Sequence, residues 1–258
     1  MPEGTATSRP VWIGTSWKMN KTLAEAREWT AGVLATLAER PELMSGIQPF
    51  VIPPLTALTT VRELLGENSP VLLGAQNAHW EDAGAWTGEV SVPQAADAGA
   101  QLIEIGHSER REHFGETVET TRLKVAATLR HDLTPLLCIG EPLEVHDAGG
   151  SAGFILDQVR GAVDGLPEEQ LGRILLAYEP IWAIGEQGRP ATPADLADPV
   201  AALQAEFGAS VRAVLYGGSV NTDNAADLLA IPGIDGLFVG RTAWELDGFR
   251  RLLEIAAA

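Results

Sequence analysis

Residues 174–190 read Ile-Leu-Leu-Ala-Tyr-Glu-Pro-Ile-Trp-Ala-Ile-Gly-Glu-Gln-Gly-Arg-Pro, an apolar run that stops at a carboxylate and continues as a loop. A short apolar run bounded by charge and glycine is typical of a fully buried parallel strand. Glu179 would then lie at the carboxyl end of that strand, where α/β folds place their chemistry. The loop has proline at both ends and glycine inside, which suits a lid but also an ordinary surface loop.

The pattern of 174–190 recurs along the chain, as apolar runs that alternate with segments of helical spacing. The helical segments carry recognisable start signals; Thr22 and Glu25, for example, form a capping box sequence at the first of them. We predict strands over 11–15, 50–52, 71–75, 102–105, 135–139, 174–178, 211–216 and 236–239, and helices over 23–37, 56–65, 93–98, 118–130, 152–163, 193–207, 224–229 and 249–257.

Strict alternation of strands and helices predicts an α/β protein with a parallel sheet. Eight such units in 258 residues predict a closed (β/α)8 barrel of the TIM-barrel type, with residues 1–258 as one domain. Within it, we expect residues 1–10 to be a flexible N-terminal extension. An open, doubly wound sheet is the alternative, and it is weaker because no G-x-G-x-x-G sequence follows the first strand.

Charge and cysteine usage narrow the possible functions. The formal net charge of −17 makes nucleic acid and anionic membrane surfaces poor partners. Cys138 is the only cysteine, which excludes an internal disulfide and suits a reducing compartment. Residues 1–10 lack the apolar core of a signal peptide, and no later segment approaches a membrane span. We therefore expect a cytoplasmic protein.

The residues that directly follow the predicted strands carry charge and glycine, and in a barrel these positions converge on one rim. Lys18 follows the first strand, His107 the fourth and Glu179 the sixth. Glycine turns follow the seventh and eighth strands, at 217–218 and at Gly240. One cation, one histidine and one carboxylate are therefore expected to meet beside two glycine turns.

Each of these residues also has an ordinary explanation when it is taken alone. Most lysines lie on the surface, most lone histidines have no catalytic task, and glycine pairs are common in turns. Glu109 and Arg110 could form a solvated ion pair of little energetic value. Their convergence at the ends of separate strands nevertheless indicates a site, and the position of Lys18 between Trp17 and Met19 favours a partly buried ammonium group.

The three side chains suit proton transfer beside a carbonyl group. Glu179 would be the base that takes a carbon-bound proton. His107, at the start of a short helix that disfavours imidazolium, would polarise the carbonyl as a neutral donor. Lys18 would hold negative charge on the substrate and on a developing enediolate.

A phosphate group could be bound by backbone N–H groups that precede helices or lie in the loop after Glu179. The candidate residues are Gly185, Ser219, Gly240 and Arg241. No cofactor is expected, and a metal is disfavoured because the five histidines show no ligand spacing.

Seven segments together resemble the triose-phosphate isomerase family along essentially the whole chain, namely 17–20, 74–77, 87–89, 106–111, 138–141, 177–185 and 216–220. The resemblance implies that Lys18, His107 and Glu179 are the catalytic trio, since a glutamate base beside a neutral histidine is established for triose-phosphate isomerase. It also places Glu109 near the lysine, and Gly185, Ser219, Gly240 and Arg241 at phosphate-binding positions.

The resemblance further implies a homodimer. The loop at 76–89 resembles the one that docks into a second subunit in this family, with Thr87 reaching the partner's site.

Three departures from the family pattern bear on the substrate. Ser16 stands where the family usually has an asparagine that binds the substrate; serine keeps a donor but is shorter, which leaves room for roughly one extra small group. Arg241 replaces a glycine and adds a cation, and 186–188 replace the usual Thr-Gly-Lys of the lid. With the segment 13–26, these features resemble a branch that isomerises tetrulose phosphates in erythritol catabolism.

The first hypothesis is therefore a cofactor-independent isomerase that converts L-erythrulose 1-phosphate to D-erythrulose 4-phosphate through an enediolate. The alternative substrate is dihydroxyacetone phosphate, converted to D-glyceraldehyde 3-phosphate in glycolysis and gluconeogenesis. A hypothesis of a different class is an inactive barrel that serves as a binding protein. It is disfavoured because no expected catalytic residue is missing.

Overall fold

The computed structural model describes residues 9–185 and 188–258. Of the N-terminal extension predicted over 1–10, only Arg9 and Pro10 are among the described residues. Glu186 and Gln187, two of the three residues in which the predicted lid departs from the family, also lie outside them.

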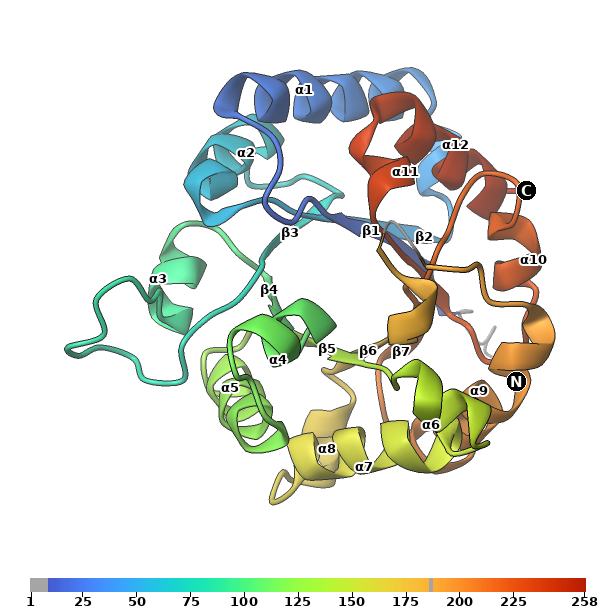
Figure 1. Cartoon of the computed structure of the whole chain (residues 1–258). Helices are drawn as coiled ribbons and strands as arrows, with labels where there is room; N and C mark the ends of the chain where they lie inside the picture. Colours follow the sequence, from blue (N-terminus) through green and yellow to red (C-terminus); the bar gives the residue numbers. More distant parts are fainter. Residues whose placement is uncertain (1–8, 186–187) are drawn as a thin grey trace, which may run out of the picture.

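Within these residues, eight parallel strands close into one barrel in the order in which they follow along the chain (Figure 1). The last strand pairs with the first, from Trp12 opposite Gly236 to Thr15 opposite Val239. The predicted (β/α)8 barrel is thus confirmed. The strands are β1 (Val11–Ser16), β2 (Ile47–Ile52), β3 (Leu72–Ala75), β4 (Leu102–Ile105), β5 (Thr134–Ile139), β6 (Leu175–Tyr178), β7 (Ala213–Tyr216) and β8 (Gly236–Val239).

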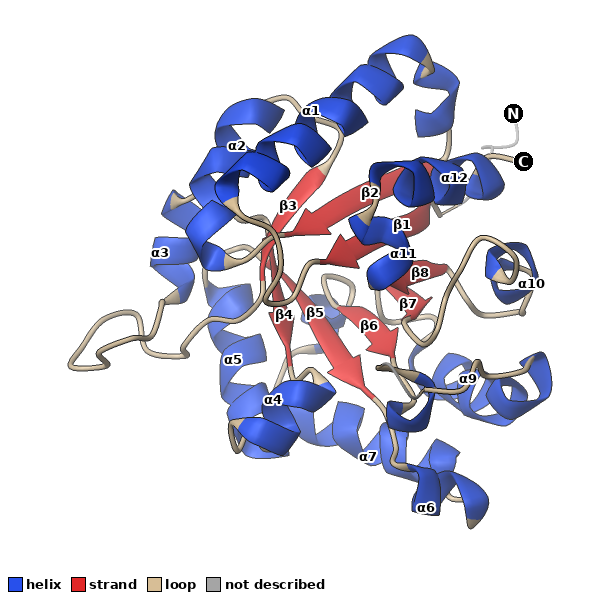
Figure 2. Ribbon diagram, turned by 45° about the horizontal axis from the view of Figure 1, so that its top comes forward, coloured by secondary structure: helices blue, strands red, loops and turns tan. Residues whose placement is uncertain are grey.

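Helices surround the strands as an outer layer, as Figure 2 shows in blue around red. Short 3₁₀ turns lie at Pro41–Met44, Leu55–Ala57 and Ile181–Ala183. The α-helices are α1 (Leu23–Glu39), α2 (Leu58–Leu65), α3 (Val92–Asp97), α4 (Ser108–His113), α5 (Val118–Arg130), α6 (Leu143–Asp147), α7 (Ser151–Val163), α8 (Glu168–Leu171), α9 (Pro193–Phe207), α10 (Ala225–Leu229), α11 (Arg241–Trp244) and α12 (Leu246–Ala256). No helix of the described chain has the length and apolar character needed to cross a membrane.

The barrel interior is filled by side chains, so it offers no channel. Alternate residues of the strands point inward, and they include Trp12, Phe50 and Phe238. The rings of Phe50 and Phe238 stack with centroids 5.7 Å apart. Gly14 provides room for this layer, because a Cβ atom there would lie 2.1 Å from the Phe50 ring. Space for a ligand at the barrel therefore lies at its rim rather than along its axis.

The segment between β3 and α3 extends away from the barrel, at the left of Figure 1. It contains the loop predicted over 76–89. His79 stacks on Trp80 at 4.2 Å and contacts Trp86 at 4.4 Å between ring centroids. Trp86 is nevertheless 50% exposed. The projecting loop thus presents the Trp86 side chain to solvent.

Candidate active site

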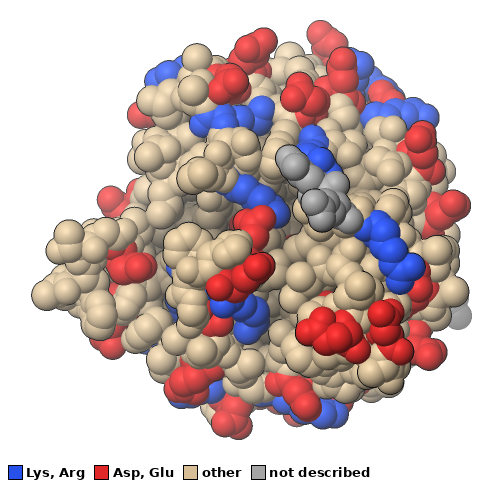
Figure 3. Space-filling view, in the orientation of Figure 1, with Lys and Arg blue, Asp and Glu red and all other residues tan. Residues whose placement is uncertain are grey.

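A cavity of about 570 Å³ opens where the carboxyl ends of the strands meet. Its lining includes every residue predicted for the site except Thr87. Figure 3 shows this face of the molecule, with basic and acidic side chains close together near its middle. Segments 91 residues apart in sequence are joined here by an ion pair between Lys18 and Glu109. The fold therefore collects the predicted residues in one place.

Lys18 follows β1 in a constrained conformation. Its φ of 51° is in the left-handed region, which non-glycine residues seldom adopt. Gln76 Nε2 donates to the Lys18 carbonyl at 2.8 Å, and Trp244 Nε1 donates to the Ser16 carbonyl at 2.8 Å. The ammonium group donates to Glu109 Oε1 at 2.6 Å. Burial would raise the pKa of Glu109, but the hydrogen bond from Lys18 lowers it below its ordinary value.

His107 is the N-cap residue of α4 and is 5% exposed. Its Nδ1 accepts a hydrogen bond from the Glu109 backbone N–H at 3.2 Å, which requires Nδ1 to carry no proton. The proton of the neutral ring is therefore on Nε2, which lies 3.2 Å from Glu179 Oε2. Burial would lower the pKa of His107, but the Glu179 carboxylate beside it raises the pKa above its ordinary value. The start of a helix was expected to disfavour imidazolium, whereas the Glu179 carboxylate favours it.

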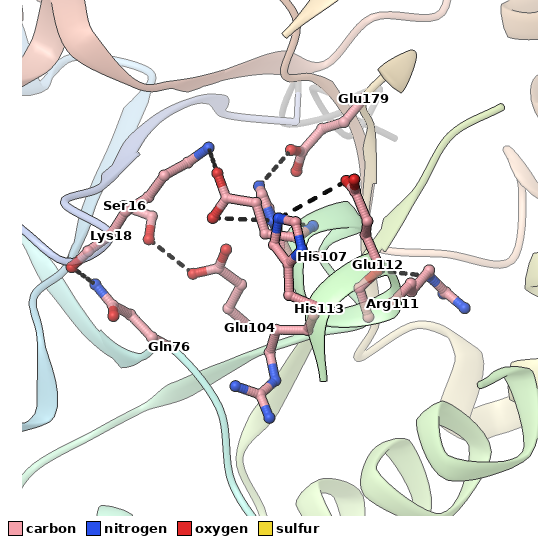
Figure 4. A network of polar contacts seen from close by, with 12 residues as sticks. Ser16, Lys18, Gln76, Glu104, His107, Arg111, Glu112, His113 and Glu179 are labelled. Atoms are coloured by element: carbon pink, nitrogen blue, oxygen red, sulfur yellow. Dashed lines mark hydrogen bonds and ion pairs between the residues drawn. The ribbon is translucent and has the colours of Figure 1, made fainter. Parts of the chain in front are cut away.

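Glu179 follows β6 and is 4% exposed. Its Oε1 has no hydrogen-bond partner within the described part of the chain, so one carboxylate oxygen is buried and unpaired. Gly217 lies against this side chain, because a Cβ atom at 217 would come within 2.6 Å of Glu179 Cγ. The glycine turn after β7 therefore has a second use, which is to leave space for a carboxylate that faces His107 (Figure 4).

Glu104 is a further acidic residue at this site that the sequence analysis did not single out. It belongs to β4 and is 4% exposed, and its Oε2 accepts a hydrogen bond from Ser16 Oγ at 2.8 Å. Burial raises the pKa of Glu104 to about 7, and the charge of Glu179 adds to this effect while His107 opposes it. The available signal was a glutamate inside an otherwise apolar strand, two residues from the inward-facing Leu102.

The other end of the cavity is formed by the turns after β7 and β8 and by the loop that follows Glu179. Ser219 Oγ donates to the Ala183 carbonyl at 2.7 Å. Arg241 Nη2 donates to the Gly185 carbonyl at 3.0 Å. Gly185 has a φ of +83°, which suits glycine. These two hydrogen bonds attach the first half of the predicted lid to the predicted phosphate-binding turns, and Gly240 lies beside them in the lining.

The loop after Glu179 is also anchored on its outer side. Trp182 Nε1 donates to Glu141 Oε1 at 3.0 Å, and Tyr178 donates to the same oxygen at 3.2 Å. The Arg189 guanidinium lies over the Trp182 ring, 4.6 Å from its centroid. Glu141 is fully buried and serves the loop rather than the cavity.

Thr87 lies in the projecting loop and is exposed. It does not line the cavity of its own chain. Its predicted role in a partner's site therefore stays a prediction.

Taken together, the cavity holds a buried carboxylate, a histidine with a defined tautomer and a paired ammonium group. This combination can remove a carbon-bound proton, donate a hydrogen bond to a carbonyl oxygen and stabilise the resulting negative charge.

Comparison with known proteins agrees with this geometry. The family model described as triosephosphate isomerase matches residues 11–256. A protein of Mycolicibacterium smegmatis named L-erythrulose-1-phosphate isomerase is 63% identical, over 100% of this chain and 98% of its own. Proteins of the same name from Brucella abortus biovar 1 and Mesorhizobium japonicum are 53% and 51% identical. These two alignments cover 94% and 96% of this chain and 94% and 97% of theirs.

Proposed function

The chain belongs to the triosephosphate isomerase family, and we propose that it converts L-erythrulose 1-phosphate to D-erythrulose 4-phosphate. The type of reaction is inferred from one observation, that Lys18, His107 and Glu179 line the same cavity. The names of the relatives, at up to 63% identity over the whole chain, support the four-carbon substrate.

The two candidate substrates differ by one group. L-Erythrulose 1-phosphate is dihydroxyacetone phosphate in which a hydroxymethyl group replaces one hydrogen on the hydroxyl-bearing carbon. That carbon, C3 of the four-carbon sugar, is also the one that must lose a proton. The same catalytic groups therefore serve both substrates, and selectivity must come from the surroundings of C3.

In the proposed reaction, Glu179 takes the proton from C3. The C–H electron pair becomes the C2–C3 double bond, and the C2 carbonyl oxygen takes up negative charge. His107 Nε2–H gives its proton to that oxygen and then takes the proton of the C3 hydroxyl, while Lys18 stabilises the negative charge. Glu179 finally returns its proton to C2. The carbonyl has moved from C2 to C3 and no atom is gained or lost, so no cofactor is needed.

The hydrogen bond at Nδ1 and the entry of the substrate explain how the ring can work as a neutral acid although the free site favours imidazolium. Its Nδ1 already accepts the backbone N–H of Glu109, so the free proton is the one on Nε2. A substrate that enters between Nε2 and the carboxylate removes the close charge that raises the pKa of His107. Protonation of Glu179 during the reaction acts in the same direction.

We place the substrate phosphate at the turns after β7 and β8. Ser219, Gly240 and Gly185 line this end, where their backbone N–H groups would bind the phosphate, and Arg241 contributes a cation in a chain whose formal net charge is −17. Such a local positive group favours a phosphate against the overall charge.

A homodimer through the 76–89 loop is also proposed, with Thr87 directed to the partner's site. The support is an extended loop that presents Trp86, 50% exposed, beside His79. Light scattering should give the mass of two chains for the unaltered protein and of one for Trp86→Glu. A monomeric unaltered protein would contradict the proposal. A cytoplasmic location is proposed as well, since the one cysteine, Cys138, is free and buried.

Product identification tests the activity. The purified protein is incubated with L-erythrulose 1-phosphate and followed by ³¹P and ¹³C NMR. We expect the carbonyl to move to the carbon next to the unphosphorylated hydroxymethyl group. No turnover of either the three-carbon or the four-carbon ketose phosphate by folded protein would instead favour an inactive barrel.

A further inference from the structure

Ser16 and Glu104 form a polar pair inside the barrel that the reaction described above does not use. Ser16 ends β1 and Glu104 belongs to β4, with β2 and β3 between them in the ring. Their 2.8 Å hydrogen bond therefore crosses the interior, above the apolar layer that contains Phe50. Ser16 lines the cavity, whereas Glu104 is not part of the lining and contacts it through Ser16.

A buried carboxyl group with few partners destabilises the folded protein. Within the described residues, the Glu104 carboxyl group has one hydrogen-bond partner, the Ser16 hydroxyl group. A carboxylate can accept about four, and a buried acid that lacks partners destabilises the fold. No cation is paired with it among the described residues, in contrast to Glu116, which contacts both Arg110 and Lys124. The fold therefore gains little from Glu104, and its position beside the cavity indicates a functional use.

The pair lies close to the reacting groups. The charges of His107, Glu179 and Lys18 all act on the Glu104 carboxyl. Figure 4 shows Glu104 facing Ser16, with its carboxyl group directed into the space bounded by Ser16 and His107. With the phosphate at the β7 and β8 turns, the end of the substrate that carries no phosphate faces this part of the cavity.

We propose that Ser16 and Glu104 form a hydrogen-bonding subsite for the C4 hydroxyl group, which belongs to the hydroxymethyl group that L-erythrulose 1-phosphate has and dihydroxyacetone phosphate lacks. This inference rests on the proposed function and names the residues that select its substrate. Ser16 contacts the substrate, and Glu104 is a positioning residue that acts through Ser16.

The direction of the hydrogen bonds gives the selectivity. A serine hydroxyl has one hydrogen to donate and two lone pairs. Because Ser16 donates its hydrogen to Glu104, it presents lone pairs to the cavity and accepts from a substrate hydroxyl. A three-carbon substrate leaves this acceptor without a donor, and sites built around a substrate hydroxyl discriminate strongly against analogues that lack it.

The test compares kcat/KM for L-erythrulose 1-phosphate and for dihydroxyacetone phosphate in the full chain. Glu104→Leu and Ser16→Ala should each lower the four-carbon to three-carbon ratio by about 10- to 100-fold, the loss expected when a buried substrate hydroxyl group is left without its hydrogen-bond partner. Glu104→Gln keeps an oxygen that accepts from Ser16 and should stay within about threefold of the unaltered ratio. The double variant should lose no more than Ser16→Ala alone, because the two residues act as one unit.

Glu116→Gln is the matched control, a buried glutamate that does not line the cavity. It is expected to lower thermal stability and to leave the substrate ratio unchanged. If Glu104→Leu does not fold, Ser16→Ala and Glu104→Gln still decide the matter. A ratio that stays constant in Ser16→Ala, or that falls equally in Glu104→Gln and Glu116→Gln, would overturn the inference.

A binding measurement separates the subsite from the reaction. Erythritol 4-phosphate and glycerol 3-phosphate have no carbonyl group and cannot react, so calorimetry reports their affinities alone. The unaltered protein should prefer the four-carbon ligand, and Ser16→Ala should remove that preference. Preference without turnover would support the subsite and contradict the proposed function. Turnover of L-erythrulose 1-phosphate without this preference would contradict the subsite alone.

Discussion

Shortening Glu179 to aspartate tests whether its carboxylate is the base. The change removes one methylene and keeps the charge. It withdraws the carboxylate by about 1.3 Å, so the contact with His107 Nε2, now 3.2 Å, lengthens to about 4.5 Å. Displacements of about 1 Å in an active site cost about 100-fold in rate. We therefore expect kcat to fall by about 100- to 1000-fold in Glu179→Asp, with KM within about threefold because the phosphate contacts are untouched.

The effect on folding should be small by comparison. One buried methylene contributes about 1 kcal/mol, so the free energy of unfolding should change by about that amount. Thermal melting measures this change and separates loss of the base from loss of the fold.

Hydrogen exchange with solvent isolates the proton transfer itself. In D₂O, the C3 hydrogen of L-erythrulose 1-phosphate is replaced by deuterium whenever the base removes it, and ¹H NMR follows the loss of its signal. The exchange rate should fall with kcat in Glu179→Asp. Glu112→Asp, at an exposed glutamate of α4, is the control and should leave the rate unchanged. An exchange rate in Glu179→Asp within about threefold of the unaltered enzyme would refute the assignment of the base.

Three other changes have defined outcomes. The pKa of Glu104 is about 7 in the folded protein and 4.5 in the unfolded chain, so the free energy of unfolding should fall by about 3 kcal/mol as pH rises through this window. Urea titrations of Glu104→Gln should lack this fall. Parallel pH dependences of the unaltered protein and Glu104→Gln would show that burial does not raise this pKa. Gly217→Ala places a Cβ atom 2.6 Å from Glu179 Cγ and should lower kcat about tenfold or more, whereas Gly153→Ala, which meets nothing within 4 Å, should leave kcat unchanged. Ser16→Asn should shift the ratio of efficiencies toward dihydroxyacetone phosphate by about tenfold or more, and an unchanged ratio would show that Ser16 is not a selector.

The barrel could be predicted because its strands are buried on both faces and read as short apolar runs. β8 and α9 agree with their predicted bounds of 236–239 and 193–207. β2 begins at Ile47, three residues before its predicted start, because Gln48 and Pro49 interrupt the apolar run. The helices α6 and α8 were not predicted, since helices of four or five residues are too short to show a period.

The position of the site could be predicted because parallel strands bring their carboxyl ends to one rim. That rule locates Lys18, His107 and Glu179 without any knowledge of distances. The rule does not locate Glu104, because this residue lies within β4 and not after it. The other three residues of β4 are apolar, so the strand reads as an ordinary apolar run. Its bond to Ser16, 88 residues away, depends on the diameter and register of the closed barrel, which no local pattern contains.

We propose that this isomerase is built for a four-carbon ketose phosphate. The most direct test is the ratio of kcat/KM for L-erythrulose 1-phosphate to that for dihydroxyacetone phosphate, measured on the same preparation at pH 7.5 and at one ionic strength. We expect a ratio above about 100, as for sites that hydrogen-bond a substrate hydroxyl. A ratio below one would contradict the claim and make the protein a triose-phosphate isomerase.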